Sequence, residues 1–183
     1  MSTPPASAEP LLRVDDLRVS FATEEGVVQT VDGVTFDLAP GEVLAVVGES
    51  GSGKSVSAMT LMGLTRSPNA RFEGTAHYKG TELIGASEDQ LRRVRGAEIA
   101  MIFQDPMTSL NPVMRIGDQI VEQIQEHEAL PGRQAHVRAV ELLEKVGIPR
   151  ARERVDNYPF EFSGGMRQRV MIALALSCNP SVL

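Results

Sequence analysis

The sequence predicts an α/β fold in which a strand, a turn and a helix follow one another between residues 43 and 64. Val43–Val47 is too short for a helix and rich in β-branched residues, so it predicts a buried strand. Gly48, Gly51 and Gly53 predict a tight turn directly after this strand. The next segment, 56–64, repeats its apolar residues at a helical period. This succession is the unit from which α/β sheets are built.

The turn has the spacing of a P-loop, Gly48-x-x-x-x-Gly53-Lys54-Ser55. Such a loop directs its backbone N–H groups and the start of the next helix at the phosphates of a nucleoside triphosphate. Lys54 would supply a catalytic cation for the β- and γ-phosphates, and Ser55 a hydroxyl ligand for Mg²⁺. The alternative is a chance match in a loop rich in glycine and serine, and the flanking strand and helix argue against it. The residues predicted to bind the nucleotide are Gly48, Glu49, Ser50, Gly51, Ser52, Gly53, Lys54, Ser55 and Val56.

The chain has 183 residues, of which 42% are hydrophobic and 23% charged, as is typical of a globular domain. Its net charge of −6 argues against a nucleic-acid-binding surface, because no basic excess is present to neutralise phosphates. No apolar run approaches the roughly 20 residues of a transmembrane helix, and residues 1–10 lack the apolar core expected of a signal peptide. The single Cys178 fits a reducing compartment. The three histidines are scattered and predict no metal cluster.

The N-terminal part predicts a disordered tail over residues 1–10, followed by an antiparallel β layer. Phe21 ends the first predicted strand close to a turn. It is either a core or hairpin packing residue, or a flat ring that stacks on a purine. Strands are expected over residues 11–22, 27–38, 71–78 and 80–84.

A second buried strand is expected at Ile99–Phe103, after a short helix that a capping box at Ser87–Gln90 opens. Gln104 follows this strand, ahead of the strand-ending Pro106. A side-chain amide there is placed to reach a ligand at the C-terminal edge of an α/β sheet, although a solvated loop amide is the alternative. Residues 11–106 are therefore assigned to a β layer plus a P-loop core.

Residues 107–160 are nearly all helical in pattern and predict a helical subdomain inserted into that core, with helices over 113–128 and 134–146. A final piece, 161–183, contains an apolar helix over 167–178, and from Ser181 onward the chain begins another strand.

The turn before that last helix is Phe162-Ser163-Gly164-Gly165-Met166. Ser163 is a preferred N-cap residue, and the two glycines permit close approach of another group. The exposed helix start is either a second anion site or a plain capped helix.

Taken together, these motifs resemble the nucleotide-binding domain of an ABC transporter from about Leu11 to Leu183. In that resemblance the P-loop is the Walker A motif, and Gln104 is the glutamine that ligates Mg²⁺ and senses the γ-phosphate. Ser163, Gly164, Gly165 and Met166 resemble the LSGGQ signature, which contacts the ATP of a partner subunit. Phe21 falls where the family has its adenine-stacking aromatic residue. The cofactors implied are ATP and Mg²⁺.

Two longer stretches, Ile102–Pro112 and Phe162–Ala173, resemble the oligopeptide, dipeptide and nickel importer ATPases. Met166 in the signature resembles the residue found there in the first (D-type) of their two ATPase subunits. The resemblance implies a peripheral protein at the cytoplasmic face of the cell (inner) membrane. It would form a head-to-tail dimer with a second ATPase subunit, either identical or a paralogue, with the paralogue favoured. Two membrane permeases and, indirectly, a substrate-binding protein would complete the importer, with no nucleic acid involved.

In the family, the strand that begins near Ser181 continues into the Walker B aspartate and the catalytic glutamate, and the sequence carries no counterpart of either before Leu183. We therefore expect the C-terminal part of the core to be missing, so that residues 1–183 alone do not hydrolyse ATP. The alternative function is accordingly a truncated, hydrolysis-incompetent nucleotide-binding fragment. We also expect these residues alone to be poorly stable, because a central strand would lack its neighbours.

Overall fold

A computed structural model of the chain describes residues 9–104 and 109–183. The chain divides into two compact units, Met1–Leu91 and Arg92–Leu183, and each unit is described by itself. Within the described ranges, no helix is long and apolar enough to cross a membrane.

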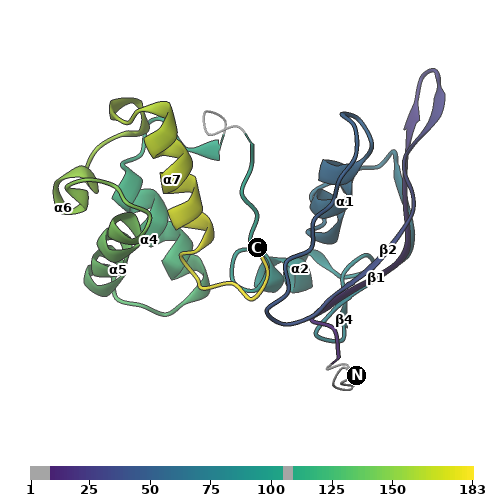
Figure 1. The fold of residues 1–183 in the computed structure, drawn as a ribbon, viewed down its shortest axis with the longest axis horizontal. Helices are drawn as coiled ribbons and strands as arrows, with labels where there is room; N and C mark the ends of the chain where they lie inside the picture. Colours follow the sequence, from purple (N-terminus) through teal and green to yellow (C-terminus); the bar gives the residue numbers. More distant parts are fainter. Residues whose placement is uncertain (1–8, 105–108) are drawn as a thin grey trace, which may run out of the picture. The chain divides into compact units, whose positions relative to one another are not determined.

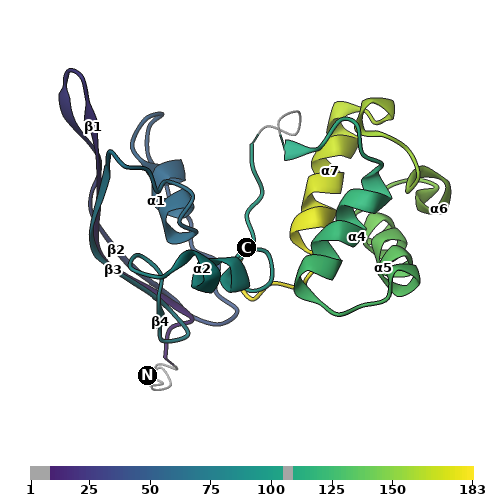
Figure 2. The same cartoon turned by 180° about the vertical axis from the view of Figure 1, so that it is seen from behind.

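The first unit is built on a four-stranded sheet in the order β2-β1-β3-β4. Every pair in it is antiparallel, which confirms the predicted β layer. Figure 2 shows β1, β2 and β3 running alongside one another as long ribbons. One face of the sheet is buried through alternating residues of β1, including Leu12, Val14 and Val19. The strands are β1 Leu12–Thr23, β2 Gly26–Leu38, β3 Ala70–Tyr78 and β4 Thr81–Glu82.

A bulge interrupts β1 at the two aspartates where the sequence breaks its apolar alternation. The register shifts between Asp15 and Arg18 on the β3 side, and Asp16 takes a positive φ of 46°. Gly74 on β3 faces this bulge, and a Cβ there would collide with the backbone oxygens of Asp15 and Asp16. Arg18 pairs with both Asp16 and Asp32, so the charges at the bulge are neutralised locally.

Two helices accompany the sheet. The predicted P-loop helix is α1, Lys54–Leu61, which contacts β1 and β2 (Figure 1). Helix α2 spans Glu88–Val94, across the boundary of the two units. Its predicted capping box is confirmed, because Gln90 Oε1 accepts from the Ser87 N–H at 2.8 Å and Ser87 Oγ accepts from the Gln90 N–H at 3.3 Å.

The two strands predicted to be buried are wrong as predictions of this structure. Val43–Val47 forms no ladder, and Val43 and Val47 are 93% and 89% exposed. Ile99–Phe103 forms no strand but two isolated parallel bridges, from Ile99 to Arg95 and to Val182, and Phe103 is exposed although Ile99 and Ala100 are buried. The physical reason is that a strand is held by its neighbours, and the described residues provide no second strand beside Val43–Val47. This exposure agrees with the expected poor stability of residues 1–183 alone, which stays a prediction.

The second unit is mainly helical, and the helical subdomain expected over residues 107–160 stays a prediction. Helices α4, α5 and α7 pack against one another around a common apolar core (Figure 1). Val170, Met171 and Ala173 of α7 are buried in that core together with residues of α4 and α5. The elements are α4 Ile116–His127, α5 Gly132–Lys145, α6 Ala151–Arg154, the 3₁₀ helix η1 Pro159–Glu161 and α7 Gly164–Ala175.

The final residues of the chain lie beside the segment that follows α2. Ala100 N–H donates to Val182 O at 2.9 Å, and Val182 N–H donates to Glu98 O at 3.0 Å. The bridge between Ile99 and Val182 is parallel, as in the sheets of α/β folds. Of the strand expected from Ser181 onward, the structure thus shows only the bridge at Val182. The domain boundaries at residues 106 and 160 stay predictions.

Candidate functional site

The P-loop has the backbone geometry of a phosphate cradle. Gly51 and Gly53 both have φ near +85°, a left-handed conformation that glycine adopts without strain. Ser52 N–H closes a turn by donating to Glu49 O at 3.2 Å. A side chain at Gly53 is excluded sterically as well, because its Cβ would collide with Thr30 O of β2. The loop is therefore held against the sheet by a position that requires glycine.

Lys54 points back into this loop. Its ammonium group donates to Gly48 O at 2.8 Å, Glu49 O at 2.6 Å and Ser52 Oγ at 3.2 Å. A half-buried cation is thus held by backbone carbonyls inside the turn. Because carbonyl oxygens carry only partial charge, an entering phosphate would offer the ammonium group a stronger partner.

The start of α1 is open. Its N-cap is Gly53, and no side chain accepts a hydrogen bond from the first turn. The first N–H groups and the positive end of the helix dipole therefore remain available to an anion. Ser55, the predicted Mg²⁺ ligand, is exposed at this end of the helix. The donors, the cation and the helix start converge on one turn, which fits a triphosphate group.

Phe21 belongs to the same unit as the P-loop. It lies at the hairpin end of β1, paired with Val28 of β2 and Ala70 of β3, and its side chain is half-exposed. The ring is thus on the surface of the sheet and is not a core residue. Its role in stacking on adenine stays a prediction.

Gln104 belongs to the second unit, where it is exposed in a bend after the bridge at Ile99. Asp105 and Pro106, which follow it, lie outside the described residues. The role of Gln104 at Mg²⁺ stays a prediction.

The signature residues lie at the start of α7. Ser163 caps the helix through Oγ, which accepts from Met166 N–H at 3.4 Å. Gly164 and Gly165 are exposed, and a Cβ added at either position would meet nothing within 4 Å. Met166 is half-buried, and its sulfur accepts from Arg154 Nη1 at 3.5 Å. Within this unit the two glycines thus face open space.

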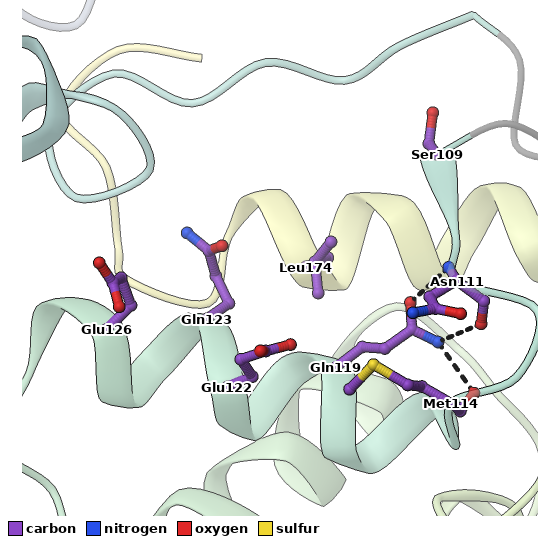
Figure 3. A pocket seen from close by; sticks show the side chains of 8 residues that line it. All are labelled: Ser109, Asn111, Met114, Gln119, Glu122, Gln123, Glu126 and Leu174. Carbon is purple, nitrogen blue, oxygen red and sulfur yellow. Dashed lines mark hydrogen bonds between the residues drawn. The ribbon is translucent and has the colours of Figure 1, made fainter. Parts of the chain in front are cut away.

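Sequence reasoning missed a hollow of about 360 Å³ beside α4 (Figure 3). Gln119 stands at one end of it, where its amide donates to Asn111 O and Met114 O at 3.0 Å each and accepts from Asn111 N–H at 3.0 Å. A second hollow, of about 440 Å³, lies along the same helix and shares Met114, Glu122 and Glu126 with the first.

A signal for these hollows is present in the sequence. Asp118, Glu122 and Glu126 recur at intervals of four residues and are all exposed, so they form an acidic stripe along α4. Like charges at this spacing are mildly unfavourable within a helix, and a basic partner would relieve them.

A family model described as ABC transporter matches residues 31–183, which is most of the chain. The chain belongs to the ABC transporter family. Among curated relatives of this ABC chain, the oligopeptide transport ATP-binding protein OppD of Bacillus subtilis is 54% identical over 174 residues, which are 94% of this chain and 49% of that protein. OppD of Escherichia coli is 50% identical over 176 residues, which are 96% of this chain and 52% of that protein. The chain thus spans about half the length of the curated relatives it matches.

Solved structures agree with the fold. A dimeric ATP-binding cassette in a post-hydrolysis state with ADP and Pi has a TM-score of 0.80 and 24% identity, over 92% of this chain and 70% of that one. The cbiO1 part of an ABC transporter complex from Clostridium perfringens has a TM-score of 0.69 and 23% identity, over 94% of this chain and 63% of that one. These likenesses confirm the predicted α/β class of ABC type, and the family match confirms the resemblance inferred from the motifs.

Proposed function

We propose that this ABC chain carries the ATP-binding site of a peptide importer. The protein binds MgATP and couples its hydrolysis to uptake of peptides, or of nickel or other small solutes, through membrane permeases at the cytoplasmic face of the membrane. The observation that carries the proposal is the P-loop, where Lys54 is held inside a turn with an uncapped helix start. Relatives named as oligopeptide transport ATP-binding proteins support the substrate class.

In this proposal the triphosphate replaces the carbonyl partners of Lys54. The backbone N–H groups of residues 48–55 would surround the β- and γ-phosphates, and a bound Mg²⁺ would supply neutralising charge. Ser55 is its proposed protein ligand in the first unit, and Gln104 is the proposed ligand from the second. The described residues contain no cluster of three His, Cys, Asp or Glu side chains that could hold a metal ion.

The second half of the site comes from another subunit. Ser163 and the following glycines leave room for a phosphate group, and the same chain offers both a P-loop and a signature turn. A head-to-tail dimer brings the P-loop of each subunit to the signature turn of the other. A solved cassette with 24% identity is a dimer, which supports this arrangement. The partner is an identical chain or a paralogue.

The acidic stripe on α4 is proposed to face the permeases. Glu122 and Glu126 border both hollows of this helix, Asp118 borders the second, and Met114 and Val121 add apolar side chains. Basic residues of a cytoplasmic permease segment would complement this surface. A substrate-binding protein then takes part only indirectly, through the permeases.

A second candidate function is a nucleotide-binding piece that does not hydrolyse ATP. The exposed segment Val43–Val47 favours it, because a P-loop that follows a segment without strand pairing is held less rigidly than catalysis requires. Release of phosphate by residues 1–183, measured beside ATP binding, distinguishes the two. Binding without release supports this second candidate, whereas turnover by these residues contradicts it.

The experiment that tests the site is Lys54→Ala in the protein as the cell makes it. We expect ATP turnover to fall at least a hundredfold and ATP binding to weaken, because the phosphates lose their cation. Lys145→Ala, which removes an exposed cation at the end of α5, is the matched control and should change neither. Unchanged turnover in Lys54→Ala would refute the assignment of the P-loop.

A further inference from the structure

Two stacked aromatic rings lie directly before the signature turn. The rings of Tyr158 and Phe160 have their centroids 5.6 Å apart and their planes at 7°. Phe160 is 71% exposed, whereas Phe162, two residues later, is 3% exposed and belongs to the core. Aromatic residues are only 4% of this sequence, and burial would be the favourable state for such a ring. A solvent-exposed aromatic ring that stacks on a second ring therefore indicates a binding site for a ligand or a partner.

The pair is rigidly held. Tyr158 N–H donates to Glu161 Oε2 at 2.7 Å, and Glu161 N–H donates back to Tyr158 O at 3.0 Å. Pro159, which lies between the two residues in the sequence, is buried and has its φ fixed by its own ring. Hydrogen bonding to Tyr158 also raises the pKa of Arg115, so this guanidinium stays charged beside the rings. Little conformational freedom remains to be lost when a flat group stacks on Phe160.

The surroundings of the pair favour a small planar ligand over the apolar core of a protein interface. Charged side chains lie beside the pair, because Arg115 interacts with Tyr158 and its Nη1 lies 3.7 Å from Oδ1 of Asp156. A polar rim around one exposed ring is a poor match for an extended hydrophobic contact. By contrast, a purine presents a π-face for stacking and polar edges for such a rim.

The position of the pair in the chain indicates which chemical group the other end of the ligand carries. Phe160 precedes Ser163 by three residues, so a ligand that stacks on the ring has its other end within reach of the signature turn. Gly164 and Gly165 leave that turn unobstructed. A base at the rings and phosphates at the turn correspond to the two ends of a nucleoside triphosphate.

We infer that the stacked pair Tyr158–Phe160 is a base-recognition site for the purine of the nucleotide that the other ATPase subunit holds in its P-loop. This inference rests on the proposed head-to-tail dimer and adds to it a contact that distinguishes purine nucleotides. In the dimer, each nucleotide then has its phosphates in the P-loop of one subunit and its base against the rings of the other subunit. Dimerisation is accordingly driven more strongly by a purine triphosphate than by the same phosphates without a purine.

The test compares Phe160→Leu with Phe160→Tyr in the protein as the cell makes it. Dimerisation is measured by analytical ultracentrifugation during titration with a non-hydrolysable ATP analogue and Mg²⁺. Phe160→Leu should raise the analogue concentration for half-maximal dimerisation about tenfold, the scale of base–aromatic stacking. Phe160→Tyr keeps the ring and should restore the wild-type concentration. Val137→Ala, an exposed apolar residue on α5, is the control and should have no effect.

A second ligand separates a base contact from a protein contact. With inorganic tripolyphosphate and Mg²⁺, Phe160→Leu and the wild type should dimerise to the same extent. An equal shift with ATP analogue and tripolyphosphate would show that the ring contacts protein and would overturn the inference, as would no shift at all with the analogue. Failure of the wild type to dimerise with any triphosphate would instead refute the proposed dimer.

Discussion

The two glycine-rich turns of this chain begin helices in the same way and are built differently. At the P-loop the N-cap is Gly53, and the positive group that an anion requires, Lys54, is already held inside the turn. At the signature turn the N-cap is Ser163, which satisfies the helix with its own side chain. Gly53 is pressed against the backbone of β2, whereas a Cβ at Gly164 would meet nothing.

In the proposed dimer, this difference separates a site that is organised within one chain from one that a second molecule completes. Gly53 is required by contacts already present, so changing it should damage the folded chain. Among the described residues, no atom lies within 4 Å of a Cβ added at Gly164 or Gly165, so their requirement should appear only when another molecule approaches.

The largest effect is expected from Gly53→Ala. The new Cβ meets Thr30 O, and alanine resists a φ of 85°, so the turn must shift. We expect the free energy of unfolding to fall by about 3 kcal/mol and ATP binding to be lost. Urea unfolding and equilibrium binding measure the two. Gly165→Ala, the matched change at the signature turn, should leave both within about 0.5 kcal/mol of the wild type.

The next effect concerns the signature turn in the dimer. Ser163→Arg should abolish ATP-driven dimerisation, because a long side chain fills the space that the glycines leave open. Binding of ATP to the P-loop of the same chain should stay largely intact. Sedimentation with and without nucleotide checks the first expectation, and fluorescence titration checks the second. Ala129→Arg, at an exposed site between α4 and α5, controls for the added charge. Dimers of Ser163→Arg would contradict the role of this turn.

A smaller effect is expected from Ser163→Ala. The substitution removes the acceptor for Met166 N–H and should lower the free energy of unfolding by about 1 kcal/mol. Ser163→Asp keeps an acceptor and should recover this loss, which chemical denaturation of both variants can measure. If Ser163→Ala is as stable as the wild type, the cap contributes nothing and the serine is needed only for a partner.

The smallest effect lies just beyond α7, where Cys178 Sγ donates to Gln123 O of α4 at 3.5 Å. Burial raises the pKa of the Cys178 thiol above its ordinary value of 9.0, so the folded chain holds this proton more tightly than the unfolded chain. The stability that the thiol adds is therefore present below pH 9 and lost as the pH rises through the folded pKa. Thermal unfolding between pH 8 and pH 10.5 should show a steeper loss for the wild type than for Cys178→Ser. Parallel curves would exclude the contribution.

The local motifs of this chain could be predicted because their causes lie within a few residues. The spacing of Gly48, Gly53 and Lys54 predicts a tight turn and a helix, and both are present. Ser87 and Gln90 form the expected capping box. The interruption of the apolar alternation at Asp15 and Asp16 coincides with the bulge of β1. In each case backbone geometry and neighbouring side chains determine the outcome.

Predictions that depend on distant segments were less successful. Val43–Val47 has the composition of a buried strand, yet burial and pairing require neighbouring strands that the pattern itself cannot supply. Gln119 lies among apolar residues of a helix, and its burial depends on Asn111 and Met114 accepting its amide protons. The hollows of α4 likewise arise from how this helix meets its surroundings.

The sequence by itself determined the glycine-rich turn before α1, the antiparallel layer, the presence of helices in the second unit and the family, because these follow from short-range spacing and composition. Tertiary structure alone decided that Lys54 turns back onto the carbonyls of its loop, and that Gly53 is confined by β2. It also decided that Phe162 is buried while Phe160 stacks on Tyr158 in the open. The physical reason is that burial and hydrogen bonding depend on atoms brought together from distant parts of the chain. Two phenylalanines that lie two residues apart carry no local difference that would predict which one is buried.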